Sequence, residues 1–307
     1  MGAERTLTER LQRFFPAPRD AAVAIGDDAA VVRNRGGDSV LCVDPVIEGV
    51  HYERGTDLLL VGRKAVNRNL ADLAAMGAVP DYLLVSLVLG KRVSAADLDR
   101  LLRGIRAAAR VSNCFVVGGD VAAFSGPMVV TVTAVGHLEG RALRRSGAKV
   151  GDAIHVTGPL GGSLDGRHLT FRPPLAEGLW LARANVPATA AMDISDGLLL
   201  DLWTMLRASG GLGAELEARA VPITAAARRR SGAEPARALK AALGDGEDHE
   251  LLFTVASGKE LPRGGPLSRR ARRPIGRVIR EPGLWLLDRG ERRLLRPLGH
   301  EHAIARS

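Results

Sequence analysis

The chain has 307 residues, of which 46% are hydrophobic and 25% charged, a composition typical of a soluble globular protein of one or two domains. No segment reaches the roughly 20 consecutive apolar residues of a membrane-spanning helix, and the N-terminus has no apolar signal core, so we expect a cytoplasmic protein without a membrane partner. The formal charge of +9 would suit a nucleic-acid partner, but aromatic residues make up only 4% and do not interleave with the arginine-rich segment 268–280, which makes nucleic acid an improbable partner.

The first part of the chain alternates helix-like and strand-like segments. Ser94 is a good N-cap, and Asp97 occupies the capping-box position three residues later. Two cysteines, Cys42 and Cys114, are expected to be buried free thiols. Helices are expected over 6–15, 57–78 and 94–111, and strands over 40–43, 82–89, 114–117 and 128–135.

A basic, Gly-rich segment follows Gly136 and predicts a junction between an N-terminal domain, 1–138, and a C-terminal domain, 139–307. In the second part, helices are expected over 175–185 and 197–209, strands over 153–157, 191–194, 213–217, 249–255, 275–279 and 284–287, and an exposed basic loop over 263–274. This mixed order indicates an α/β or α+β fold.

Acidic residues next to glycines or at the ends of apolar runs are the most informative feature, because unpaired charges are rarely placed there for structural reasons alone. They are Asp27, Asp28, Asp44, Asp72, Asp120, Asp193, Asp196, Glu247 and Asp248.

Asp72 lies within an otherwise apolar helical segment. Arg68, four residues earlier, and Asn69, three residues earlier, can share its helix face. It is either a ligand-binding acid or a surface acid paired with Arg68, and a surface pair would contribute little stability.

Asp120 follows two glycines after a predicted strand. Ligand groups gather at strand ends in α/β folds, and glycines let a backbone approach phosphate closely. The same three residues also suit a simple turn, so this position alone leaves both interpretations open.

Taken together, so many carboxylates would repel one another unless cations accompany them. Hard oxygen ligands of this kind suit Mg²⁺, which links protein carboxylates to nucleotide phosphates. Neither a Walker A loop nor the protein-kinase signature set occurs in the chain. If ATP binds, its phosphates must be held through metals and backbone amides.

Seven motifs in this order resemble the thiamine-monophosphate kinase family, of the superfamily that includes aminoimidazole ribonucleotide synthetase. They are IGDDAAVV, VDPVIEGVHY, GRKAVNRNLADLAAMGAVPDY, VVGGDV, GRALRRSGAKVGDAIHVTG, MDISDGLLLDL and GDGEDHELLFTV. The resemblance implies two α/β domains, the first for ATP and metal binding and for dimerisation, with its strands forming a barrel across a homodimer.

The resemblance also implies roles for individual residues. The implied magnesium ligands are Asp28, Asp44, Asp72, Asp120, Asp193 and Asp196. The implied ATP contacts are Gly119, Asp120, Arg145 and Ser195, with Asp72, Asp120 and Arg145 as catalytic residues. The implied contacts of thiamine monophosphate are His51, Glu247 and His300; without the resemblance, His51 would be interpreted as a polar loop residue.

The implied reaction is direct, in-line transfer of the ATP γ-phosphoryl group to a phosphate oxygen of thiamine monophosphate. That oxygen is already an anion at neutral pH, so no general base is needed. Positioning and charge neutralisation by several Mg²⁺ ions would supply the catalysis.

The chain departs from the family pattern near the implied site. Cys42 and Val43 replace hydroxyl residues before Asp44, Ala71 replaces a serine, and Val121 replaces a threonine. Near the C-terminus, His300 stands in place of a tyrosine and Ala303 in place of a phenylalanine. These differences leave open a paralogue that phosphorylates another small acceptor, an ATP-dependent ligase of the same fold, or a non-catalytic nucleotide-binding regulatory protein.

Overall fold

The computed structural model describes residues 10–16, 18–19, 21–23, 31–32, 38–90, 92–232 and 234–300. The chain divides into two compact units. The first unit comprises Met1–Leu73 and Ala78–Glu139, and the second comprises Ala74–Gly77 and Gly140–Ser307. Asp28 and Ala303 lie outside the described residues, as does part of the predicted helix 6–15, of which residues 10–14 are helical.

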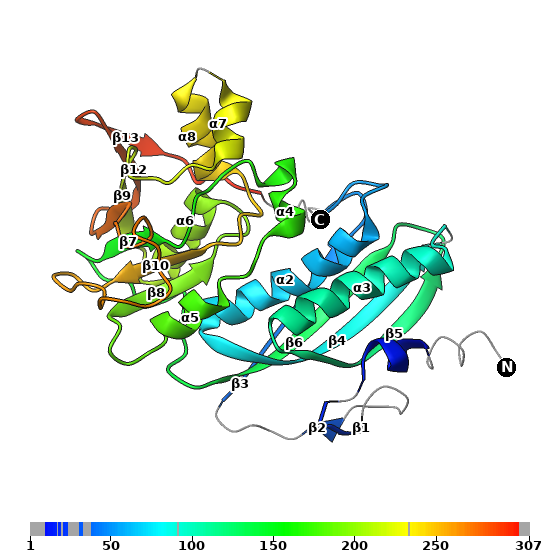
Figure 1. Ribbon diagram of the computed structural model, residues 1–307. Coiled ribbons are helices and arrows are strands. Elements are labelled where there is room, and N and C mark those ends of the chain that lie inside the picture. Colours follow the sequence, from blue (N-terminus) through cyan, green and yellow to red (C-terminus); the bar gives the residue numbers. More distant parts are fainter. Residues whose placement is uncertain are drawn as a thin grey trace, which may run out of the picture. The chain divides into compact units, whose positions relative to one another are not determined.

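The first unit is built on a four-stranded sheet with the order β3-β6-β4-β5 (Figure 1). Strands β4 and β5 are parallel, and the other neighbours are antiparallel. The strands are β3 (Ser39–Ile47), β4 (Ala78–Gly90), β5 (Phe115–Phe124) and β6 (Val129–Leu138), with a separate pair β1 (Ala21–Val23) and β2 (Val31–Val32).

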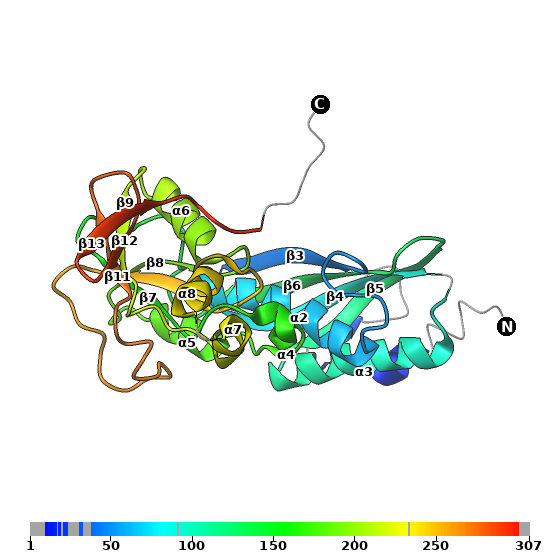
Figure 2. The same cartoon turned by 90° about the horizontal axis from the view of Figure 1, so that it is seen from above.

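Two long helices, α2 (Leu58–Met76) and α3 (Ala95–Val111), lie on one face of this sheet (Figure 2). They approach each other through glycines, since a Cβ on Gly62 would meet the Leu101 carbonyl oxygen at 2.3 Å and one on Gly104 would meet that of Leu59 at 2.0 Å. The capping box of Ser94 and Asp97 is present, which confirms the predicted start of α3.

The opposite face of the sheet carries exposed apolar side chains. Val43 is 59% exposed and Leu84 39%, and the register places both in one row with Thr133. Leu41 on β3 is 67% exposed. The sheet is open in the single chain, because β3 and β5 form its two edges among the described residues.

The second unit contains a seven-stranded sheet with the order β13-β12-β9-β11-β7-β10-β8, antiparallel except between β9 and β12. Its strands are β7 (Ala153–Val156), β8 (Ala188–Asp193), β9 (Gly213–Glu217), β10 (Leu251–Val255), β11 (Gly276–Ile279), β12 (Gly283–Asp288) and β13 (Glu291–Leu295). Its helices are η1 (Ser163–Asp165), α4 (Arg167–Thr170), α5 (Leu175–Leu181), α6 (Leu198–Ala208), α7 (Ala225–Ser231) and α8 (Pro235–Gly244).

Both faces of this second sheet are covered. On β10, Leu252 packs into one core with residues of α6 and α8, whereas Leu251 and Phe253 pack into another core with Trp180 of α5. Every residue of β10 is buried as a result. This explains why the strand has a continuous apolar sequence rather than an alternating one.

Most predicted elements are confirmed, with three kinds of difference. Strand β5 continues past Gly119 and Asp120 to Phe124, so this carboxylate lies inside a strand and not after its end. Helices α4, α7 and α8, the short helix η1 and strands β1, β2 and β13 were not predicted. Cys114 is buried as expected, but Cys42 is only partly buried.

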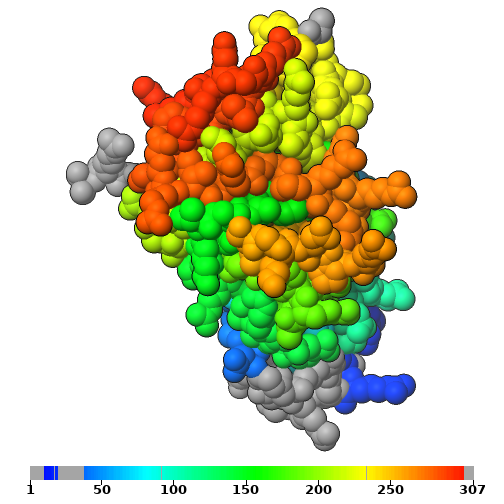
Figure 3. All heavy atoms as spheres, turned by 90° about the vertical axis from the view of Figure 1, so that its left-hand side faces the viewer, coloured from blue at the N-terminus to red at the C-terminus, as the bar shows by residue number. Residues whose placement is uncertain are grey.

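The arginine-rich loop 263–274 lies on the surface of the second unit, as predicted (orange in Figure 3). Leu267 and Ala271 anchor it in the core, and the Arg272 guanidinium lies 5.5 Å from the centre of the Trp180 ring. No described helix is long and apolar enough to cross a membrane.

Candidate functional site

In the first unit, Asp44 on β3 and Asp72 on α2 both lie close to the thiol of Cys42. Burial first, and then the negative charges of Asp72 and Asp44, raise the pKa of that thiol. The thiol donates a hydrogen bond of 3.4 Å to the Asn69 carbonyl oxygen. The structure therefore brings Asp44 and Asp72 together around the face of the sheet that carries α2.

Arg68 on α2 lies near Asp44. Its Nη2 atom is 3.8 Å from Asp44 Oδ1, and its side chain is only 12% exposed. Asp72 itself is partly buried. The Arg68 side chain is therefore largely buried beside Asp44.

Gly119 and Asp120 lie on β5, at the edge of the sheet opposite to Asp44. Three interstrand steps separate β3 from β5, or about 14 Å along the sheet. Gly119 has φ 152°, and a Cβ there would meet the Val85 carbonyl oxygen at 1.9 Å, so only glycine fits. Asp120 is exposed and pairs with Ser86.

His51 lies in the turn after β3 and is only 9% exposed. Its Nδ1 accepts a 3.0 Å hydrogen bond from the Ile47 amide, and its carbonyl oxygen accepts a 2.6 Å bond from Nζ of the fully buried Lys64. Lys64 thus connects α2 to this turn and fixes the position of His51.

In the second unit, Asp193 ends β8 and is buried, and Ser195 and Asp196 follow it in the turn that leads to α6. The loop 245–250 lies against this turn: the Glu247 amide donates to the Ser195 carbonyl oxygen at 2.7 Å and the His249 amide to that of Ile194 at 2.8 Å. Two predicted groups, distant in sequence, are therefore neighbours.

His249 connects Asp193 to Glu247. Its Nδ1 lies 3.6 Å from Asp193 and its Nε2 3.6 Å from Glu247, and its ring stacks on Phe171 with centroids 4.2 Å apart. Burial lowers the pKa of His249, but the two carboxylates outweigh that effect and raise it overall. The ring therefore lies between the two acids, at distances longer than a hydrogen bond.

Asp201 on α6 is a third acid beside Asp193 and Asp196. It accepts hydrogen bonds of 3.1 Å from the amides of Asp196 and Gly197. Burial, followed by the charges of Asp193 and Asp196, raises the pKa of Asp201 to about 8. Negative charge is thus concentrated at this turn, which is the condition that a bound cation relieves.

A buried network supports the loop that carries Glu247. The carboxylate of Asp248 is fully buried and accepts bonds from the Gly161 amide at 3.0 Å, from the Ser163 hydroxyl and from Arg167 at 3.0 Å. Burial raises the pKa of Asp248 to about 6, although those three donors oppose the rise.

The loop needs these contacts because two of its residues have an unfavourable backbone conformation. Glu247 has φ 62° and His249 φ 51°, values uncommon for residues other than glycine. Arg167 also forms an ion pair with Glu250. The network therefore offsets the backbone cost and holds the Glu247 carboxylate in place.

His300 and Arg145 complete the predicted residues of the second unit. The His300 amide donates to the Asp196 carbonyl oxygen at 2.8 Å, which places this residue beside the acidic turn. Arg145 is exposed, and its carbonyl oxygen accepts a bond of 3.4 Å from Ser209.

No group of three or more His, Cys, Asp or Glu side chains within the described part of the chain is close enough to hold a single ion. Mg²⁺ in nucleotide sites commonly uses one or two protein carboxylates and completes its shell with water and phosphate oxygens. The pairs Asp44–Asp72 and Asp193–Asp196 fit that requirement, so their oxygen donors are compatible with magnesium.

Sequence reasoning missed two residues that shape these sites. Asp201 lies within the quoted motif of Asp193 and Asp196, and its helical spacing from Gly197 could have suggested it. His249 adjoins Glu247 and Asp248, but only the fold turns its ring toward Asp193.

Comparisons with known proteins agree on one class. Residues 26–138 match the family model of the AIR synthase related protein, N-terminal domain. A thiamine-monophosphate kinase of Rhodopirellula baltica is 40% identical over 281 residues, covering 86% of this chain and 85% of the relative. One from Mycobacterium tuberculosis is 34% identical and covers 93% and 87%.

Solved structures give the same result. The crystal structure of thiamine-monophosphate kinase from Stenotrophomonas maltophilia K279a has a TM-score of 0.78 and 32% identity, covering 92% of this chain and 96% of that one. AaThiL complexed with AMPPCP and TMP has a TM-score of 0.73 and 26% identity, covering 97% and 98%. A hydrogenase maturation protein HypE in complex with ATP, at 21% identity and a TM-score of 0.76, shares the fold.

Residues 26–138 thus correspond to an AIR synthase related N-terminal domain, in a chain whose two units both mix helices and strands. The chain is also 40% identical to the Rhodopirellula baltica thiamine-monophosphate kinase over most of the length of both proteins, which identifies one family within this class. The chain belongs to the thiamine-monophosphate kinase family.

Proposed function

We propose that this protein transfers the γ-phosphoryl group of ATP to thiamine monophosphate and so produces thiamine diphosphate. The main support is its 40% identity to a thiamine-monophosphate kinase along nearly the full length of both chains. The related complex of AaThiL with AMPPCP and TMP holds an ATP analogue, in keeping with this proposal.

Mg²⁺ is the proposed metal, with Asp44 and Asp72 as ligands in the first unit and Asp193 and Asp196 in the second. Asp120 and Asp28, the latter outside the described residues, are proposed as further ligands. When bound, the metal neutralises charge on the phosphates and on the transferred group. Asp201 accepts bonds from the Asp196 and Gly197 amides, so three acids lie close together at the second-unit turn, which supports a cation there.

The chain's own residues bind and orient the two substrates. Gly119, Arg145 and Ser195 are the proposed ATP contacts, and the Arg145 guanidinium would bind phosphate oxygens. His51, Glu247 and His300 are the proposed contacts of thiamine monophosphate. Glu247 would be held in place to bind thiamine monophosphate, because the Asp248 hydrogen bonds and the neighbouring His249 ring fix the loop that carries it.

No residue needs to remove a proton from the acceptor, because a phosphate oxygen of thiamine monophosphate is already anionic. The oxygen attacks the γ-phosphorus of ATP in line, and the bond from that phosphorus to the β–γ bridging oxygen breaks to release ADP. Catalysis by this chain would therefore consist of alignment, with Arg145 offsetting phosphate charge and Asp72 and Asp120 holding the cation that would offset the rest.

A homodimer is the proposed assembly. The exposed row of Val43 and Leu84, together with Leu41, leaves apolar surface on one sheet face that a second copy would bury. A second sheet could also close the open edges β3 and β5 into a barrel, in which Asp120 at one edge approaches Asp44 of the other copy. We further propose a cytoplasmic location, in agreement with the two free cysteines.

A coupled assay of ADP release tests the reaction across thiamine monophosphate, thiamine and aminoimidazole precursors. We expect turnover with thiamine monophosphate only, accompanied by formation of thiamine diphosphate. Turnover with another acceptor alone would indicate a paralogue with altered substrate, which the replacements at Cys42 and His300 make worth testing. Nucleotide binding without turnover would indicate a regulatory protein.

A further inference from the structure

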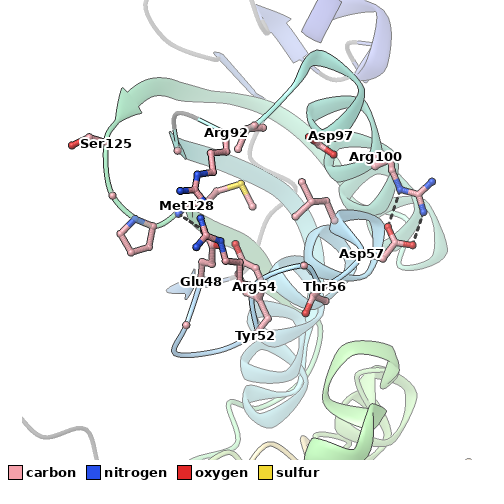
Figure 4. Close-up of a pocket in the computed structure, with 17 residues that line it drawn as sticks. Glu48, Tyr52, Arg54, Thr56, Asp57, Arg92, Asp97, Arg100, Ser125 and Met128 are labelled. Carbon is pink, nitrogen blue, oxygen red and sulfur yellow. Dashed lines mark hydrogen bonds and ion pairs between the residues drawn. The ribbon is translucent and has the colours of Figure 1, made fainter.

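A cavity of about 980 Å³ opens in the first unit at the end of its sheet (Figure 4). Three segments line it: the turn between β3 and α2, the connection from β4 to α3, and the turn between β5 and β6. None of its lining residues belongs to the carboxylate sites described above. Its volume is that of a pocket for a small organic molecule.

Tyr52 lines this cavity and is only 5% exposed. Its hydroxyl is buried and has no hydrogen-bond partner among the described residues. The nearby Glu48 carboxylate already accepts a 3.1 Å bond from the Met128 amide and lies 3.8 Å from Nε of Arg54. Buried hydroxyls are nearly always hydrogen-bonded, so this one indicates a group that enters the cavity.

Two arginines converge on the same space. In Figure 4 the side chains of Arg54 and Arg92 point toward one another next to Glu48. Arg92 has no ion-pair partner within the part of the chain that the structure describes. Two guanidinium groups repel each other unless an anion lies between them, and one carboxylate offsets only one of the two charges.

The remaining charges at the cavity are already paired. Arg100 donates to both carboxylate oxygens of Asp57, at 2.9 and 2.5 Å, and Asp97 is engaged in the capping box with Ser94. The acids of the cavity are therefore not arranged to hold a metal ion. The lining carries three arginines and three acids, and among its described arginines Arg92 is the one without a carboxylate partner.

We propose that this cavity binds the phosphate group of a small phosphorylated molecule, through Arg54, Arg92 and the Tyr52 hydroxyl. The planar guanidinium matches the oxygens of a phosphate group, and the tyrosine hydroxyl supplies a further donor. Leu58, Val93 and Met128 add apolar surface for the rest of an organic phosphate. The site needs no metal.

Calorimetric titration of the full chain in EDTA tests the proposal. The probes are inorganic phosphate, pyrophosphate and adenosine 5′-monophosphate, because comparing them separates a free phosphate from an organic phosphate as the preferred ligand. We expect one metal-independent site for at least one probe. The absence of metal-independent binding for all three probes would overturn the proposal.

Three variants test whether the phosphate probes bind in this cavity. Arg92→Glu should weaken binding by at least about tenfold, and Tyr52→Phe by about threefold to tenfold. The matched control Arg106→Glu makes the same charge change at an exposed position on α3 and should leave binding unchanged. Equal losses in Arg92→Glu and Arg106→Glu would show a nonspecific charge effect and refute the site.

Asp72→Asn separates this site from the proposed kinase activity. It should remove turnover but keep phosphate binding in EDTA, because Asp72 does not line the cavity. Loss of that binding in Asp72→Asn would show that the phosphate probes bind at the carboxylate site instead.

Discussion

The two units place their acidic residues differently. In the second unit, one turn and one loop bring Asp193, Asp196, Glu247 and His249 together within a single chain. In the first unit, Asp44 and Asp72 meet near Cys42, whereas Asp120 lies on the opposite edge of the sheet.

The two sheets also differ in how far their faces are covered. The seven-stranded sheet is covered on both faces, while the four-stranded sheet leaves Val43 and Leu84 exposed on one face. The second unit thus gathers its acids within one chain. In the proposed homodimer, a second copy would cover the four-stranded sheet of the first unit and bring another Asp120 toward Asp44.

Asp72→Asn tests the first-unit pair and should have the largest effect. It removes one charge from a partly buried carboxylate with almost no change in shape, so we expect turnover to fall by about a hundredfold or more. Circular dichroism and the melting temperature should remain near those of the parent. Near-normal turnover would contradict a role for Asp72 in metal binding.

The double variant Val43→Asp/Leu84→Asp tests whether the open sheet face is covered by a second copy. Uncompensated charges in a buried interface should raise the dimer Kd by at least about a hundredfold. Light scattering should show a monomer, with reduced turnover. Val111→Asp is the control, since that residue is 83% exposed at the end of α3; an unchanged oligomeric state in the double variant would exclude this face as the interface.

Asp201→Asn tests the crowding of charge in the second unit. The pKa of Asp201 is raised to about 8 by burial and by two neighbouring acids, so the folded state keeps a proton that the unfolded state releases at lower pH. Its contribution to stability is full below about pH 4 and is lost as the pH rises toward 8.

The neutral amide can still accept the bonds from the Asp196 and Gly197 amides. Asp201→Asn should therefore be more stable than the parent by about 1.4 kcal/mol or more at pH 8, with a smaller difference at pH 5. Urea unfolding without magnesium at both pH values measures this. A constant difference between parent and variant would show that Asp201 does not titrate in this range.

His300→Ala should have the smallest effect. The residue lies at the surface beside Asp196, so its loss should raise the KM for thiamine monophosphate by about threefold to tenfold with little change in kcat. Steady-state kinetics with varied acceptor and saturating ATP measures both constants. An unchanged KM would mean that His300 does not contact the thiamine ring.

Local sequence patterns determined much of this molecule. Apolar periodicity predicted α2 and α3, the Ser94 and Asp97 pair marked the start of α3, and alternating apolar runs marked β6 and β9. The family motifs also predicted the acids of the second-unit turn. Such features depend on residues a few positions apart, and a single sequence displays them directly.

The tertiary structure alone decided which acids meet. The bridge from His249 to Asp193 joins residues 56 positions apart, and the Asp248 network depends on Gly161 and Ser163 of a distant loop. The separation of Asp44 from Asp120 follows from strand order, which no local pattern specifies. The Arg54 and Arg92 cavity likewise exists only because β3 and β4 end at the same side of the sheet.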